Sequence, residues 1–144
     1  MWEGDRVDFM GHVSLVIVSH SRKLAQGVAE LAAQLTGPSV CIMACGGVED
    51  GDLGTSAPDI VNAILACPED SPVLLFFDMG SAFMNCEMAL ELVDEATRSR
   101  AQIVDAPLVE GVVEAAVSAG LGHSQEQVME SALRARNQVK ILGR

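Results

Sequence analysis

Short apolar runs alternate with amphipathic segments along the chain. The first run, residues 12–18 (HVSLVIV), and the third, residues 72–77 (PVLLFF), consist mainly of β-branched or large apolar residues. Two shorter runs of the same kind occupy residues 39–44 and 101–104. Because strands that are buried on both faces are short and continuously apolar, these runs predict four strands of an interior sheet.

The segment after the first run has the periodicity of an amphipathic helix that stops at Gly37-Pro38. Its large apolar residues recur three or four positions apart, which predicts that they form one face of the helix: Leu24, Val28, Leu31 and Leu35. Two more helices are predicted near the C-terminus, over residues 108–119 and 124–139. The second of these opens with Ser124 and Glu126-Gln127, which indicate a capping box.

Two further helices are predicted between the second and the fourth run. The earlier one begins near Ala57, has Pro58 in its first turn and ends before Pro68. The later one covers about residues 82–95 and carries acidic residues on its outer side. Their predicted inward-facing residues are Ile60, Ile64 and Leu65 in the earlier helix, and Met84, Met88 and Leu92 in the later one.

Strands that alternate with helices indicate an α/β fold in three layers, with helices on both faces of a mainly parallel sheet of four to five strands. In such sheets, ligands bind at the C-terminal ends of the strands. Polar turns follow the first three strands, at residues 19–21, 46–56 and 78–81. These three turns are therefore predicted to form the functional site.

The length and charge of the chain limit what it can be. Its 144 residues fit a single domain, assigned to residues 11–144, with residues 1–10 expected to be a disordered extension. The formal net charge is −11, and no Lys or Arg lies between Lys23 and Arg98, which argues against nucleic-acid binding. An acidic surface instead suits a basic protein partner.

Targeting signals and cysteine usage both point to the cytoplasm. No apolar run approaches the roughly 20 residues that span a bilayer, and residues 1–11 lack the apolar region of a signal peptide. The four cysteines, Cys41, Cys45, Cys67 and Cys86, have no metal-like spacing. They are expected to be reduced core residues.

His20 is the candidate catalytic residue because it directly follows a buried strand, whereas His12 and His123 lie where a solvated or capping role is the simpler interpretation. Asp78 occupies the same position after the third strand. If the two strands are neighbours, the carboxylate accepts a hydrogen bond from one ring nitrogen of His20 and leaves the other nitrogen as a nucleophile. The alternatives are a structural role for His20 and a helix-capping role for Asp78.

A phosphoryl group on His20 would need hydrogen-bond donors around its oxygens. Two predicted helices begin at this edge of the sheet, after Gly54-Thr55-Ser56 and after Gly80-Ser81, and helix N-termini bind anions. The glycines also fit simple turn geometry, and Arg22 and Lys23 either meet the phosphate or are solvated. The chain contains neither the G-x-x-x-x-G-K-[ST] nor the G-x-S-x-G motif and no metal-ligand cluster, so phosphate relay is favoured over nucleotide binding or hydrolysis.

Four segments in this order, residues 15–21, 46–56, 78–82 and 106–111, resemble the phosphotransfer subunit of bacterial dihydroxyacetone kinases. That subunit belongs to the mannose-type enzyme IIA group of the phosphoenolpyruvate-dependent phosphotransferase system. The resemblance implies a homodimer, a strand order of 2-1-3-4 and a phosphotransferase activity with a phosphohistidine intermediate. In that activity His20 receives phosphate from the phosphocarrier HPr and passes it to the ADP-binding kinase subunit.

The same resemblance assigns roles within the site. Asp78 is implied to be the hydrogen-bonding partner of His20. The implied phosphate-binding residues are Ser21, Gly54, Thr55, Ser56, Gly80 and Ser81. This chain is expected to hold no metal or cofactor, because ADP or ATP and magnesium belong to the partner kinase subunit.

Two alternatives are left open by the sequence. The first is a mannose-type enzyme IIA domain that serves a sugar transporter, with the same fold and the same histidine. The second is a regulatory binding module with a structural histidine, which would be preferred if His20 were buried away from solvent.

Overall fold

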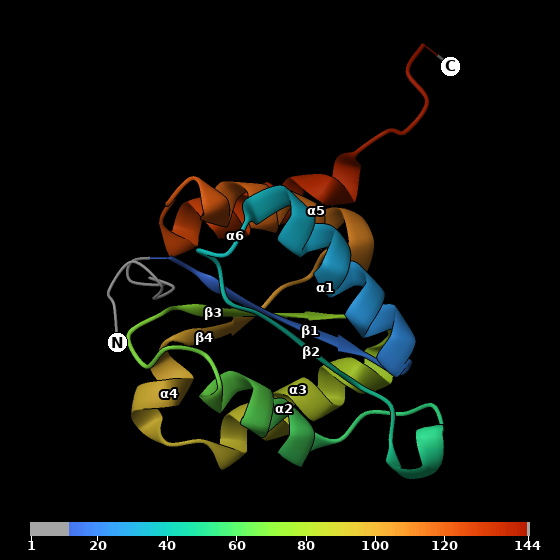
Figure 1. The fold of residues 1–144 in the computed structure, drawn as a ribbon, viewed down its shortest axis with the longest axis vertical. Helices are drawn as coiled ribbons and strands as arrows, with labels where there is room; N and C mark the ends of the chain where they lie inside the picture. Colours follow the sequence, from blue (N-terminus) through green and yellow to red (C-terminus); the bar gives the residue numbers. More distant parts are fainter. Residues whose placement is uncertain (1–11, 144) are drawn as a thin grey trace.

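The computed structural model describes residues 12–143, so the extension expected at residues 1–10 lies outside the described residues. Four parallel strands form its sheet: β1 (Ser14–Ser19), β2 (Ile42–Gly46), β3 (Val73–Phe77) and β4 (Ala101–Ile103). Their order is β2-β1-β3-β4 (Figure 1). The predicted strand order and parallel pairing are therefore confirmed.

Helices cover both faces of the sheet, as predicted (Figure 1). One face carries α1 (Arg22–Thr36), α5 (Leu108–Gly120) and α6 (Gln125–Arg134). The other carries α2 (Ala57–Leu65), α3 (Gly80–Leu92) and the short α4 (Glu95–Ser99). Two 3₁₀ turns, η2 (Glu49–Gly51) and η3 (Ala135–Asn137), complete the described elements.

The core consists of two apolar layers, one on each side of the sheet. Leu15 and Ile17 of β1 face α1 and α5, whereas Val16 and Val18 face α2 and α3. Alternate residues of β3 divide in the same way. Because β1 and β3 are covered on both faces, they are continuously apolar, and this is the property by which the sequence reveals them.

The inward face of α1 differs from the prediction. Val28 is buried as predicted, but Leu24, Leu31 and Leu35 are exposed, and the helix buries Ala25 and Ala32 instead. Small side chains let a helix approach a sheet closely, so alanines occupy the contact and the leucines lie at its margins.

The same error occurs in α2 and α3. Ile60 and Ile64 are buried as predicted, but Leu65 is exposed. In α3 the buried residues are Ala82, Cys86 and Ala89, while the predicted inner stripe of Met84, Met88 and Leu92 faces outward. The helix predicted over residues 82–95 is also two helices, because Asp94 caps a new helix through the backbone N–H of Thr97.

Three other predictions concern the cysteines, the last helix and the membrane. All four cysteines are buried and free, as expected, and burial raises the pKa of Cys45 to about 11 and that of Cys86 to about 12. The capping box of Ser124 and Gln127 is present at the start of α6. Within residues 12–143, no helix is both long enough and apolar enough to cross a bilayer.

Candidate phosphotransfer site

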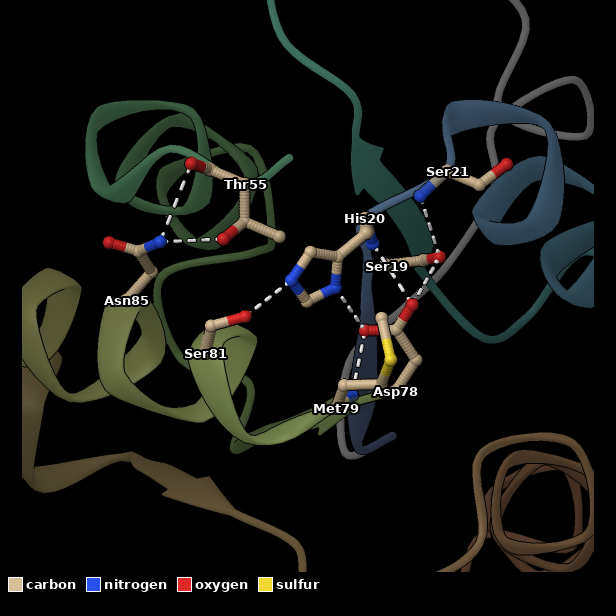
Figure 2. Close-up of polar contacts among 8 residues, drawn as sticks. All are labelled: Ser19, His20, Ser21, Thr55, Asp78, Met79, Ser81 and Asn85. Carbon is tan, nitrogen blue, oxygen red and sulfur yellow. Dashed lines mark hydrogen bonds and ion pairs between the residues drawn. The ribbon is translucent and has the colours of Figure 1, made fainter. Parts of the chain in front are cut away.

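The turns after β1 and β3 meet because these strands are neighbours in the sheet. Val18 of β1 pairs with Phe77 of β3, so His20 and Asp78 leave the sheet side by side (Figure 2). The Nδ1 atom of His20 lies 2.8 Å from Oδ1 of Asp78. The side chain of His20 remains 17% exposed, so the ring is not buried away from solvent.

The Asp78 carboxylate accepts four hydrogen bonds, two at each oxygen. Oδ1 accepts from Nδ1 of His20 and from the backbone N–H of Met79 at 2.8 Å. Oδ2 accepts from the hydroxyl of Ser19 at 2.8 Å and from the backbone N–H of His20 at 3.0 Å (Figure 2). Four donors fix both the position and the rotation of the carboxylate.

These donors also determine the ionisation of Asp78. Burial acts to raise the pKa of the carboxyl, but the hydrogen bond from the His20 ring, followed by those from the His20 backbone, Ser19 and Met79, outweighs it. The pKa of Asp78 is therefore lowered below its ordinary value, and the group is an anion at neutral pH. An anionic acceptor at Nδ1 places the ring proton on that nitrogen.

The other ring nitrogen of His20 faces the beginning of α3. With the proton on Nδ1, Nε2 carries the lone pair and accepts a hydrogen bond from the Ser81 hydroxyl at 2.5 Å. The nucleophilic atom thus points at the first turn of a helix (Figure 2).

That first turn has unused donors. The N-cap residue of α3, Met79, makes no side-chain capping bond, whereas Ser21 caps α1 and Ser56 caps α2. Among residues 12–143, the backbone N–H groups of Gly80 and Ser81 have no hydrogen-bond partner. Unpaired N–H groups at the start of a helix form a site for an anion.

The loop residues predicted to bind phosphate are engaged in local structure. Gly54 has a φ of 151° and donates its backbone N–H to the His20 carbonyl at 2.8 Å. The hydroxyls of Ser21 and Ser56 accept the capping bonds of their helices. Thr55 accepts a hydrogen bond from Nδ2 of Asn85 at 2.6 Å, which joins this loop to α3 (Figure 2).

Of the predicted residues, Asp78 and Ser81 form hydrogen bonds with the His20 ring. Gly80 lies next to Ser81 in the chain, and its backbone N–H has no hydrogen-bond partner among residues 12–143. Ser21, Gly54, Thr55 and Ser56 surround this centre and hold the turns in place. Within residues 12–143, no group of His, Cys, Asp and Glu is arranged to hold a metal ion.

Sequence reasoning assigned no role to two residues of the site: Ser19, although it lies in the predicted turn at residues 19–21, and Asn85. Ser19 is completely buried and connects the turn, because its hydroxyl donates to Asp78 and accepts from the backbone N–H of Ser21. In the sequence, Ser19 is marked only by its position as a hydroxyl residue at the end of an apolar run. Asn85 lies in the second turn of α3, where no pattern distinguishes it from a solvated residue.

An arrangement of this kind can carry a phosphoryl group covalently. A partly buried anion holds one ring nitrogen, the other nitrogen is nucleophilic and partly exposed, and the backbone N–H groups of Gly80 and Ser81 have no partner among residues 12–143. No general base is needed for this chemistry, since a ring nitrogen that carries no proton has a lone pair for the attack.

Comparison with known proteins agrees with a phosphotransfer site. Residues 14–129 match the EIIA-man family, described as the PTS system fructose IIA component. The chain is 40% identical over 118 residues to the phosphoryl donor subunit DhaM of PEP-dependent dihydroxyacetone kinase 2 from Listeria innocua, covering 82% of this chain and 94% of that protein. It is also 40% identical over 126 residues to the corresponding DhaM subunit of Escherichia coli, of which it covers 27%.

A solved structure agrees with the match in sequence. The crystal structure of EF1359, a protein of unknown function, superposes with a TM-score of 0.80 at 30% identity and covers 92% of this chain and 99% of its own. The chain belongs to the EIIA-man family, and within that family to the DhaM-type phosphoryl donor subunits.

Proposed function

We propose that this chain is a phosphohistidine carrier that accepts phosphate from HPr on Nε2 of His20 and passes it to the ADP-binding subunit of a dihydroxyacetone kinase. The observation that carries the proposal is the orientation of the ring. Nδ1 is held by an anionic Asp78, and Nε2 faces the uncapped start of α3.

In the first step, the Ser81 hydroxyl turns away from Nε2, and the lone pair attacks the phosphorus carried by the donor. The Nε2–P bond forms while the P–N bond of the donor breaks, and that electron pair returns to the donor nitrogen. The His20 ring then carries a proton on Nδ1 and phosphorus on Nε2, and it is positively charged. Asp78, 2.8 Å from Nδ1, offsets this charge.

The phosphoryl oxygens would be held without a cationic side chain. The free N–H groups of Gly80 and Ser81 and the Ser81 hydroxyl are the donors available on this side of the ring. The partial positive charge at the start of a helix adds to their effect. In the second step, an oxygen of the terminal phosphate of ADP attacks phosphorus, and the Nε2–P electron pair returns to the ring.

We assign the nucleotide and its magnesium to the acceptor subunit and no cofactor to this chain. The names of the similar proteins favour a kinase over a sugar transporter as the destination of the phosphate. The homodimer implied by the resemblance stays a prediction that light scattering would test, and the cytoplasmic location likewise stays a prediction.

The proposal is tested by incubating the protein with ³²P-labelled phosphoenolpyruvate, enzyme I and HPr. We expect one acid-labile phosphate per chain, and we expect His20→Ala to abolish it. His123→Ala is the matched control, because that ring bonds to Ser118 at 2.9 Å, away from the site. A label that persists in the His20 variant would refute the assignment.

A further inference from the structure

Helix α3 presents four large apolar side chains to solvent, and three of them, all except Phe83, lie on one face. Met84, Met88 and Leu92 are 67%, 53% and 60% exposed, and their spacing of four places them on one face. We call these three residues the α3 stripe. The same helix fills the core with Ala82, Cys86 and Ala89, so the stripe contributes nothing to the interior of this chain.

The α3 stripe is continuous with the phosphotransfer site. A hollow of about 380 Å³ runs along the helix and is lined by Ser81, Met84, Asn85, Glu87, Met88 and Glu91. Ser81 forms one end of the hollow, and its hydroxyl is also 2.5 Å from Nε2 of His20. A protein seated on the stripe would therefore reach the atom that carries the phosphoryl group.

Acidic side chains lie along the stripe, and the guanidinium of Arg98 lies at the far end of α3, where it donates to the carbonyls of Glu91 and Val93. Glu87 and Glu91 line the hollow, and α3 contains neither Lys nor Arg. The complementary surface is an apolar centre with basic residues at its rim, which is the usual organisation of a protein interface. Methionine side chains are flexible and polarizable and adapt to the shape of such a partner.

We propose that the α3 stripe is the docking surface for the kinase subunit that takes the phosphoryl group from His20. This inference rests on the proposed function and adds the surface and the chemistry of its partner. Each of the similar proteins is named as a subunit of a dihydroxyacetone kinase. The kinase subunit that accepts the phosphate is therefore the partner with which such a chain assembles. Contacts between the subunits of one enzyme are more apolar than transient contacts, so an apolar surface favours a kinase subunit over a separate phosphate donor.

The experiment uses protein that has been phosphorylated on His20 by the donor proteins and then separated from them. ADP-loaded acceptor subunit from the same genome is added at rising concentration, and loss of label is followed. The double variant Met84→Lys/Met88→Lys is compared with Leu121→Lys, a 69% exposed leucine after α5, on the other face of the sheet. Both variants change exposed positions, and circular dichroism is used to check that they fold.

In the double variant, we expect the acceptor concentration for half-maximal transfer to rise by about tenfold or more, as for loss of central interface residues. Phosphorylation by HPr and all values for Leu121→Lys should stay within about twofold of wild type. Glu87→Lys/Glu91→Lys should also weaken acceptor binding and reduce its dependence on salt.

Three results would overturn the inference. The first is wild-type transfer to the acceptor by the double variant. The second is an equal loss in phosphorylation by HPr, which would assign the stripe to the donor. The third is a change from dimer to monomer in light scattering, which would assign it to a second copy. Absence of label on wild-type His20 would instead refute the proposed function at an earlier step.

Discussion

Replacing Asp78 by asparagine keeps the shape of the side chain, removes its charge and turns one of its two acceptor atoms into a donor. Neither orientation of the amide suits the site. An NH₂ group at the position of Oδ1 faces the backbone N–H of Met79 and Nδ1 of His20, so the ring proton moves to Nε2. An NH₂ group at the position of Oδ2 faces the backbone N–H of His20.

The size of the effect follows from these contacts. Two opposed donors lower the free energy of unfolding by about 1–3 kcal/mol. If the ring keeps its proton on Nδ1, a neutral acceptor replaces a charged one, which removes about 1–2 kcal/mol and slows phosphorylation about 5- to 30-fold. If the proton moves to Nε2, the nucleophile is lost, and the loss in comparable His–Asp pairs is about 10⁴-fold.

Two measurements on Asp78→Asn separate these cases. Rapid-quench single-turnover phosphorylation by HPr gives the rate, which we expect to fall by between about 5-fold and 10⁴-fold. Nitrogen-15 NMR of histidine-labelled protein gives the position of the ring proton, which should be on Nδ1 in the wild type. If the variant keeps the wild-type tautomer and its rate stays within about threefold of wild type, Asp78 has only a structural role at the start of α3.

Three further predictions concern stability and pH. Ser19→Ala removes a donor to Asp78, and urea denaturation should show a loss of about 1–2 kcal/mol; no loss would contradict the network. Gly46→Ala places a Cβ atom against the Ser19 carbonyl oxygen and should lower the free energy of unfolding by more than about 2 kcal/mol. Gly27→Ala, with nothing within 4 Å of the new Cβ atom, should instead stabilise α1 by about 0.5–1 kcal/mol. Equal effects of the two substitutions would rule out the close approach at Gly46. Because the pKa of Asp78 is lowered in the folded state, its contribution is complete above its ordinary value of 3.8 and disappears as the pH falls through the lowered value. The stability difference between wild type and Asp78→Asn should therefore shrink in acid, and a constant difference would contradict the lowered pKa.

The sheet could be read from the sequence, but the helix faces could not. The buried strands are continuous apolar runs, and their alternation with helices permits few topologies. In α1, the buried Ala25 and Ala32 follow the exposed Leu24 and Leu31 by a single position, so both sets have helical spacing. Hydropathy predicts that the leucines face the core, whereas close contact with the sheet favours the smaller alanines there. Only the distance between the helix and the sheet decides which set is buried.

The centre of the site was predictable for a related reason. His20 and Asp78 each directly follow a buried strand, and parallel strands bring such positions to one edge of the sheet. Ser19 and Asn85 depend on partners 59 and 30 residues away, which no local pattern records. The free donors of α3 were likewise visible only once the capping serines of α1 and α2 had been compared with Met79.

The missing cap of α3 links the chemical state of the carrier to the order of that helix. A phosphoryl group on Nε2 would complete the first turn that Met79 leaves open, and charges at a helix start contribute about 0.3–2 kcal/mol. Transfer of the group would remove that contribution again. Because the α3 stripe lies on the same helix, an acceptor would meet a firmer surface on a loaded carrier than on an empty one, and the empty carrier would leave more readily.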